Sequence, residues 1–295
     1  MMEKEFNSAK KAYEEYNLNT SYNLTLNLLR YIYERIQANK NEIEEILRMN
    51  KRKYRYSDLI KNVKKWVSEK IEYKSQINVK KIDNKFISAI YKTAIGVVAV
   101  ECYDFLECVK YMIESIKTRN AIIISDVEYF EKDDKNFILM IIQEALKKFE
   151  VNENLIQIVP YEECDYTKCD KVIYTYDNKN IKNREKNETD DLYVYIETEE
   201  LKKEALDEFN YQKSKGNNVY LIEGNNREFL EKINKSRSKG VVIYTKNKEL
   251  AYKFLTLVNS KNVFINCTLD YIENVKKCDN ELLENKKIMY ELIEL

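Results

Sequence analysis

Cysteine is the residue type in this chain that could supply a nucleophile or a metal ligand. Six are present: Cys102, Cys108, Cys164, Cys169, Cys267 and Cys278. No two have the C-x-x-C spacing, and the chain has no histidine, so a zinc site would need four converging thiolates. The lack of histidine also excludes a Ser-His-Asp triad or a Cys-His pair. We therefore expect no metal site and interpret the cysteines as reduced thiols.

The glycines are too few and too widely spaced to form a phosphate-binding loop. Four are present, Gly96, Gly216, Gly224 and Gly240. Neither G-x-G-x-x-G nor G-x-x-x-x-G-K can be formed from them, which excludes the enzyme classes that depend on these loops.

Charge and hydropathy favour a cytoplasmic globular protein. The 295 residues carry 50 Lys+Arg and 50 Asp+Glu, and 44% are apolar. A net charge of zero argues against a nucleic-acid partner. No apolar run approaches the ~20 residues of a membrane span, so we expect no membrane partner.

Apolar residues in the first third recur at helical spacing. Leu29, Ile32, Ile36, Ile43 and Leu47 predict one face of a single long helix. Ile60, Val63, Val67 and Ile71 predict a second helix, with Ser57 as its expected N-cap.

From Lys80 onward, short apolar runs alternate with helical stretches. Strands are expected at 86–92, 94–100, 121–124, 155–159, 172–175, 192–196, 219–222, 241–244 and 263–265. Helices are expected at 106–117, 134–149, 199–213, 227–235 and 248–258. This alternation predicts an α/β fold with mostly parallel sheets covered by helices.

A polar connector at residues 176–191 marks the best domain boundary. We predict a nucleotide-binding-like α/β domain with N-terminal helices at 1–190 and a second α/β domain at 191–268. The segment 269–295 is expected to be a helix or an extended oligomerisation arm.

Several passages resemble the aldehyde dehydrogenase superfamily, most closely its γ-glutamyl phosphate reductase branch. The run AIGVVAV at 94–100 with NAIII at 120–124 resembles the superfamily's "P-x-G-V-V … G-N-A-V-x-L" core. The passages VVIYTK at 241–246 and SKNVFINCT at 260–268 are similar to its late "I-x-T-x-D … S-x-x-V-x-V-N-x-S-T" region.

The resemblance implies a Rossmann-type NAD(P)-binding domain, a catalytic α/β domain and an oligomerisation arm. Members of the superfamily form a thioester or thiohemiacetal on a cysteine and exchange hydride with a nicotinamide. They bind the dinucleotide without G-x-G-x-x-G, so the glycine argument does not exclude them.

This chain departs from the family pattern where the chemistry resides. The segment that follows a helix like 199–213, which carries the nucleophile in the family, is SKGNN at 214–218 and has no cysteine. The family's basic cofactor-contacting residue is replaced by Ser125, and its Gly-Ser or Gly-Gly pair by Tyr176-Asp177. The oxyanion-hole asparagine turn is replaced by 101–105. The chain is also shorter than a full-length member, so we expect a reduced second domain.

Four residues remain as candidate site residues. Cys102 is the candidate for a relocated nucleophile, although the neighbouring Asp104 would disfavour its thiolate. Ser125, Asp126 and Glu128 follow a predicted strand and are candidates for cofactor contacts. Asp126 and Glu128 could equally cap the next segment.

The leading hypothesis is a non-catalytic homologue that acts by binding or assembly. We expect a homo-oligomer, a dimer in the first instance, or a mixed oligomer with a full-length homologue, and no bound cofactor. One alternative is an NAD(P)-dependent oxidoreductase that acts on an aldehyde or acyl phosphate. The other is a small-molecule sensor that uses the vestigial cleft.

Overall fold

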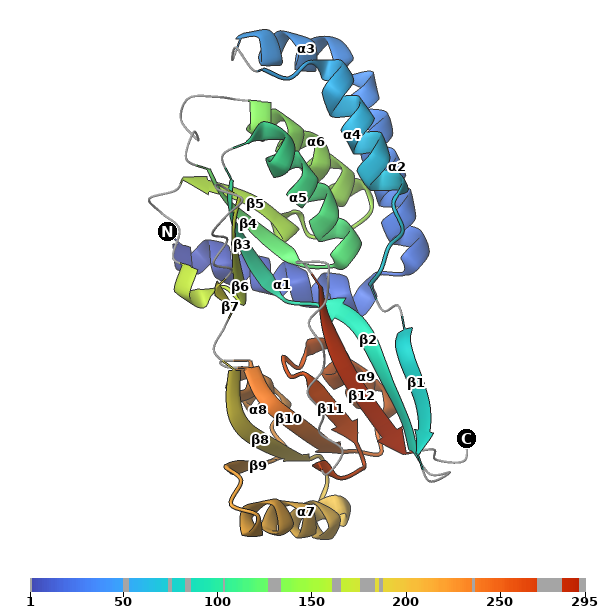
Figure 1. Cartoon of the computed structure of the whole chain (residues 1–295), viewed down its shortest axis with the longest axis vertical. Helices are drawn as coiled ribbons and strands as arrows, with labels where there is room; N and C mark the ends of the chain where they lie inside the picture. The colour runs from blue at the N-terminus through green and yellow to red at the C-terminus, as the bar shows by residue number, and fades with distance from the viewer. Residues whose placement is uncertain are drawn as a thin grey trace. The chain divides into compact units, whose positions relative to one another are not determined.

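The chain divides into two compact units, which its path joins three times. The computed structural model describes residues 2–49, 53–73, 76–82, 86–102, 104–126, 134–160, 166–175, 184–185, 188–234, 237–269 and 283–291. Unit 1 comprises Met1–Glu72 and Ala94–Glu185, and unit 2 comprises Tyr73–Thr93 and Lys186–Leu295 (Figure 1).

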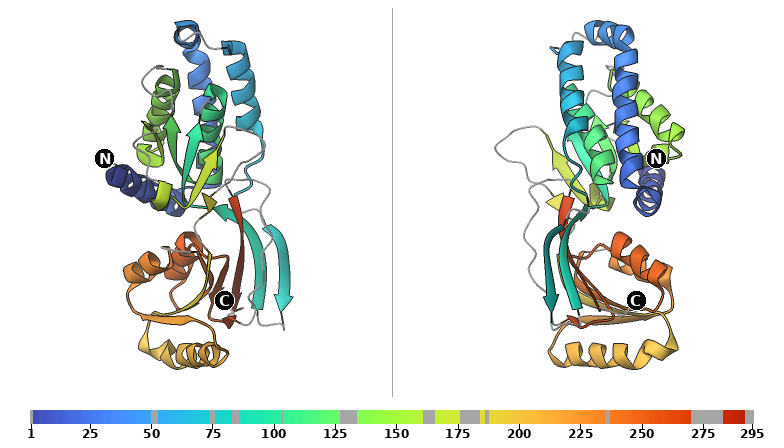
Figure 2. Two further views of the ribbon diagram at one scale, coloured as in Figure 1. Left: turned by 60° about the vertical axis from the view of Figure 1, so that its left-hand side comes forward. Right: turned by 90° about the vertical axis from the view of Figure 1, so that its right-hand side faces the viewer.

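Unit 1 begins with four helices. They are α1 (Met2–Asn19), α2 (Tyr22–Ala38), α3 (Lys40–Met49) and α4 (Tyr56–Ser68). The apolar stripe from Leu29 to Leu47 is buried, as the sequence predicted. Helices α2 and α4 run side by side (Figure 2).

The prediction of one long helix through residues 29–47 is wrong, because the helix breaks at Asn39. The Asn39 backbone amide and side-chain Nδ2 both donate to the Arg35 carbonyl, at 3.1 and 2.8 Å. Asparagine side chains often compete with the helical backbone in this way. The expected N-cap at Ser57 is also wrong: α4 begins at Tyr56, and the Asp58 carboxylate accepts the Arg55 N–H at 3.0 Å.

The sheet of unit 1 has the strand order β5-β4-β3-β6-β7. The strands are β3 (Val97–Cys102), β4 (Ala121–Asp126), β5 (Ile156–Pro160), β6 (Lys171–Tyr174) and β7 (Arg184–Glu185). All neighbours are parallel except β6 and β7. Helices α5 (Phe105–Thr118) and α6 (Asp134–Lys148) connect the first three strands and pack against the sheet.

The predicted strand at 94–100 is divided by Gly96. Strand β2 (Phe86–Ala94) ends before this glycine, and β3 begins after it at Val97. Gly96 has φ +135°, and a Cβ there would lie 2.2 Å from Asp170 Oδ2. That carboxylate accepts the Val97 N–H at 2.9 Å. A glycine is therefore required at the point where the chain enters the sheet.

Unit 2 contains a seven-stranded sheet of order β1-β2-β12-β11-β10-β8-β9. The strands are β1 (Gln76–Ile82), β2 (Phe86–Ala94), β8 (Glu188–Ile196), β9 (Val219–Glu223), β10 (Arg237–Tyr244), β11 (Asn262–Ile265) and β12 (Leu283–Glu291). From β12 to β9 all neighbouring strands are parallel, whereas β1 and β2 are antiparallel.

Helices cover both faces of the parallel part of this sheet. Side chains that alternate along the strands divide between two cores. One core packs Tyr195 and Val241 against α8 (Asn226–Ile233) and α9 (Lys248–Leu257). The other packs Val194 and Val242 against α7 (Lys202–Ser214). The predicted α/β class with mostly parallel sheets is confirmed.

The described part of the C-terminal segment is the strand β12, not a helix. Its Lys286 side chain is buried, and Nζ donates to the carbonyls of Leu255 and Val258 at 2.9 and 2.6 Å. These carbonyls belong to the C-terminal end of α9, where a cation is favoured by the helix dipole.

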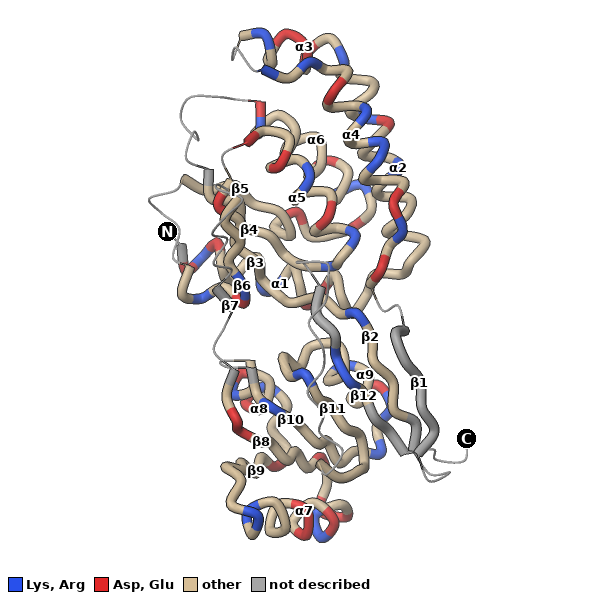
Figure 3. Tube along the Cα trace, in the orientation of Figure 1, with Lys and Arg blue, Asp and Glu red and all other residues tan. Residues whose placement is uncertain are grey.

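Acidic and basic residues are interspersed along the helices of both units (Figure 3). Among the described residues, no helix is long and apolar enough to cross a bilayer.

Candidate ligand-binding edges of the two sheets

The strand order of unit 1 places the reversal of winding at the carboxyl ends of β3 and β6. The chain steps outward from β3 through β4 to β5 and then returns to the other side of β3 as β6. Open α/β sheets bind ligands where the winding reverses in this way. The residues that follow β3 lie at this edge and also begin α5, whose N-terminal amides favour an anion.

In this chain the N-terminus of α5 is occupied by a carboxylate of its own. Asp104 Oδ1 accepts the N–H groups of Leu106 and Glu107 at 2.9 and 3.2 Å. Its Oδ2 accepts the Tyr54 hydroxyl and lies 3.4 Å from Lys53 Nζ. Burial alone would raise the pKa of Asp104, but the hydrogen bonds from Tyr54, Glu107 and Leu106 hold it below its ordinary value.

Cys102 lies at the end of β3 and is fully buried. Its thiol donates to the backbone carbonyl of Asp104 with Sγ and O 3.3 Å apart. A reactive thiol needs access to substrate and a group that favours the thiolate. Cys102 is instead buried, and its thiol is a hydrogen-bond donor to the backbone. It therefore lacks the access to substrate that a nucleophile needs.

Ser125 lies at the end of β4 and is also fully buried. The Tyr166 hydroxyl, from the short helix η3 (Tyr166–Lys168), lies 2.9 Å from Ser125 Oγ and 3.2 Å from Glu101 Oε2. Because a phenol carries one proton, Tyr166 donates to one of these oxygens at a time. The Tyr166 ring also contacts Tyr174 edge to face, with centroids 6.3 Å apart. Ser125 is thus buried and hydrogen-bonded to Tyr166, so a cofactor could reach this serine only after a local rearrangement.

Of the other two candidates, Asp126 is described only in its backbone, and Glu128 is outside the described residues. Asp126 ends β4 and pairs in register with Cys102 and Pro160, so the backbone of both Cys102 and Asp126 lies at the predicted edge. Glu128 lies outside the described residues, as does the Tyr176-Asp177 pair. Within the described ranges, no group of three or more potential ligands could hold a metal ion.

The contacts that organise this edge join residues far apart in the chain, and the sequence alone did not reveal them. Tyr54 meets Asp104 across 50 positions, and Tyr166 meets Glu101 across 65. No periodicity or short motif encodes such pairs. The single local signal was Asp104, two residues before the helix predicted at 106–117, since an aspartate near a helix start is a common N-cap.

In unit 2, the segment 214–218, which the sequence resemblance places at the family's nucleophile, forms the turn between α7 and β9. The Ser214 hydroxyl donates to the Tyr211 carbonyl at 2.7 Å, and Asn217 Nδ2 donates to Gln212 Oε1 at 2.8 Å. Gly216 has φ +81° at the centre of the turn. These groups bond to the end of their own helix, and the turn contains no thiol.

The late motif of the resemblance forms a clamp between the ends of β10 and β11. Asn266 Oδ1 accepts the Thr245 N–H at 2.9 Å, and Asn266 Nδ2 donates to the Thr245 carbonyl at 2.8 Å. The Thr245 hydroxyl donates to the Glu197 carboxylate. In this structure Asn266 and Thr245 therefore join strand ends, and Cys267 is buried in the core beside them.

Comparison with known proteins finds similarity at the level of structure. No protein-family model matches the chain, and no curated protein matches its sequence. A γ-glutamyl phosphate reductase from Thermotoga maritima superposes with a TM-score of 0.53 at 14% identity, over 97% of each chain. The γ-glutamyl phosphate reductase of Saccharomyces cerevisiae gives a TM-score of 0.56 at 14% identity, over 99% of this chain and 98% of that one.

An indole-3-acetaldehyde dehydrogenase superposes with a TM-score of 0.50 at 11% identity, over 98% of this chain and 86% of that one. The similarity to the two reductases covers nearly the whole chain and so includes both units. The chain therefore has the α/β fold of the γ-glutamyl phosphate reductases and aldehyde dehydrogenases.

Proposed function

We propose that this chain is a non-catalytic protein with the aldehyde dehydrogenase fold, which acts by binding or assembly. The observation that carries the proposal is the placement of the cysteines. The turn at 214–218 has none. The four cysteines that the structure describes, Cys102, Cys108, Cys169 and Cys267, are all buried. A buried thiol cannot attack a carbonyl carbon without a conformational change.

The dinucleotide edge supports the same proposal. Where the resemblance implies NAD(P), the groups present fit a dinucleotide poorly. The Asp104 carboxylate already bonds to the first amides of α5, and it would repel a pyrophosphate placed there. Ser125 carries no positive charge, and it is buried and hydrogen-bonded to the Tyr166 hydroxyl.

Thermal unfolding in the presence of NAD, NADH, NADP and NADPH tests the cofactor part. A ligand present at 100 times its Kd would stabilise the fold by about 2.7 kcal/mol. We expect no shift in Tm with any of the four, while a γ-glutamyl phosphate reductase assayed in parallel should show one. A clear shift would favour the oxidoreductase or a nucleotide sensor.

Turnover assays test the catalytic part. We expect no nicotinamide oxidation or reduction with γ-glutamyl phosphate or simple aldehydes. Should turnover appear, Cys102→Ala and Cys108→Ala form a matched pair, since both remove a fully buried thiol. Loss of turnover only in Cys102→Ala would establish an enzyme with a relocated nucleophile and overturn the proposal.

The proposal includes assembly in the cytoplasm as a homo-oligomer or with a full-length homologue. Light scattering of the purified chain should give the mass of a dimer. A monomer that also fails to co-purify with a full-length homologue would contradict the assembly role.

A further inference from the structure

A cavity of about 360 Å³ lies in unit 1, away from the carboxyl ends of β3 and β6. Its lining comes from the last turn of α1, the first turn of α2 and the segment 149–152. That segment connects the end of α6 to the start of β5. The cavity therefore lies near the amino end of β5, whereas the candidate cofactor edge lies at the carboxyl ends of β3 and β6. Its volume falls in the range of small-molecule sites.

The lining of this cavity is electronegative. It contains two carboxylates, Glu15 and Glu150, and neither lysine nor arginine. The carbonyl ends of α1 and α6 also come together here and add partial negative charge, against the single N-terminus of α2, which adds partial positive charge.

Three cations lie near this lining. Lys11 is 73% exposed and lies 3.8 Å from Glu15, and Lys147 is paired with Glu153 at 2.6 Å. The Arg119 guanidinium lies 5.9 Å from the centroid of the Tyr16 ring.

Two polar groups of the lining are held in place by hydrogen bonds within the protein. Asn152 Nδ2 donates to Glu15 Oε2 at 2.8 Å and so fixes one oxygen of that carboxylate. The Tyr16 hydroxyl donates to the Ile116 carbonyl at 3.2 Å. Burial raises the pKa of Tyr16 to about 12, so the phenol is neutral at physiological pH.

An aromatic wall beside carboxylates suits one class of ligand. The Phe149 side chain lines the cavity together with the two glutamates, and Tyr16, which is 2% exposed and faces the Arg119 guanidinium, lies behind them. Ammonium and guanidinium groups bind carboxylates through charge-assisted hydrogen bonds and are attracted to aromatic rings. We propose that this cavity binds a small organic cation, an aliphatic amine or a guanidinium compound. This site is independent of whether the chain has lost catalysis.

Calorimetric titration of the full chain with agmatine and with putrescine tests the proposal. We expect saturable binding of one molecule per chain, and none of 1,4-butanediol, the uncharged counterpart of putrescine. Glu15→Gln and Glu150→Gln should each weaken binding by about 10-fold, since each removes a charge-assisted contact. Asn19→Trp keeps every charge but adds a large side chain to the lining of the cavity, and it should abolish binding.

Glu34→Gln is the matched control. Glu34 lies on α2, outside the cavity, with its side chain 54% exposed and paired with Arg30 at 3.1 Å. Its loss should leave the affinity unchanged, and circular dichroism should show that every variant is folded. The proposal is overturned if the wild type shows no saturable binding. It is equally overturned if Glu34→Gln weakens binding as much as Glu15→Gln, or if Asn19→Trp binds normally.

Discussion

At the scale of single residues, two asparagines that carry the family resemblance hold strand ends together through hydrogen bonds to the backbone. Asn120 Oδ1 accepts the N–H groups of Ile95 and Gly96 at 2.8 and 3.0 Å, and so joins the amino ends of β3 and β4. Asn266 joins β10 to β11 in a similar way. The resemblance was therefore recognisable because residues that shape the fold are present, although the residues expected to do chemistry are replaced.

Gly96→Ala should strongly destabilise unit 1. An added Cβ would collide with Asp170 Oδ2, and φ +135° is unfavourable for any other residue. Backbone strain of this kind costs roughly 1–3 kcal/mol, before any displacement of Asp170. Urea unfolding measures the loss, with Gly216→Ala as the control: its φ is also positive, but no atom lies within 4 Å of the added Cβ. Equal losses in the two variants would contradict the role assigned to Asp170.

Asp104 should make folding dependent on pH. Its pKa is lowered in the folded protein, so its contribution is present above the unfolded value near 4. The contribution is lost as pH falls from there through the folded pKa. Asp104→Asn keeps a helix-capping oxygen but cannot titrate. We expect the variant to be less stable than wild type by about 1 kcal/mol at pH 7, and the difference to shrink as pH falls below 4.

Urea titrations at pH 7, 5, 4 and 3 measure how the difference shrinks. Asp190→Asn is the control, since its carboxylate is 96% exposed. A difference between Asp104→Asn and wild type that stays constant from pH 7 to pH 3 would show that the Asp104 charge has no part in stability.

At the scale of elements, most helices and strands followed from the sequence, because their apolar residues keep one period. The failures have local or distant causes. Asn39 and Gly96 interrupt elements that the apolar pattern alone would continue. Strand β1 was not anticipated, and residues 269–295 allowed either a helix or an extended arm. A strand in a mixed sheet depends on its neighbours as well as on its own residues.

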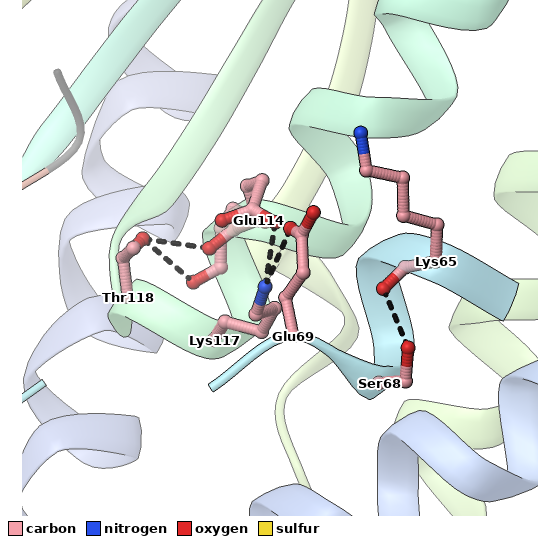
Figure 4. A network of polar contacts seen from close by, with 7 residues as sticks. Lys65, Ser68, Glu69, Glu114, Lys117 and Thr118 are labelled. Atoms are coloured by element: carbon pink, nitrogen blue, oxygen red, sulfur yellow. Dashed lines mark hydrogen bonds and ion pairs between the residues drawn. The ribbon is translucent and has the colours of Figure 1, made fainter. Parts of the chain in front are cut away.

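A buried lysine of α5 pairs with a glutamate of its own helix and with the residue that follows α4 (Figure 4). Lys117 is 4% exposed, and its Nζ lies 2.8 Å from Glu114 Oε1 and 3.6 Å from Glu69 Oε2. Lys117→Met leaves the Glu114 carboxylate in a largely buried position without this partner, which should cost about 2–4 kcal/mol. Lys65→Met, which removes an exposed ammonium from α4, should cost little.

The double variant Lys117→Met/Glu114→Leu separates charge from packing. Because it removes both buried charges, it should recover a substantial part of the stability lost in Lys117→Met. Chemical unfolding of the four proteins measures these differences. A double variant less stable than Lys117→Met would show that the side chains matter through packing and not through their charges.

At the scale of the whole molecule, the two units have separate cores, so unfolding should depart from two-state behaviour. Calorimetry should give an enthalpy larger than the van't Hoff value. Gly96→Ala should lower the transition of unit 1, and Lys286→Met, which removes the buried contacts to the end of α9, should lower that of unit 2. A single transition that both variants lower alike would contradict this expectation.

The position of β12 determines when the sheet of unit 2 can be completed during translation. It lies between β2 and β11 in the seven-stranded sheet, although it is the last of those strands in the chain. On the ribosome, the hairpin of β1 and β2 emerges early and must remain without its sheet neighbour until β12 has been translated. Unit 1, whose segments are all made before residue 186, faces no such delay. Nascent chains arrested before residue 283 should therefore present an open strand edge to chaperones.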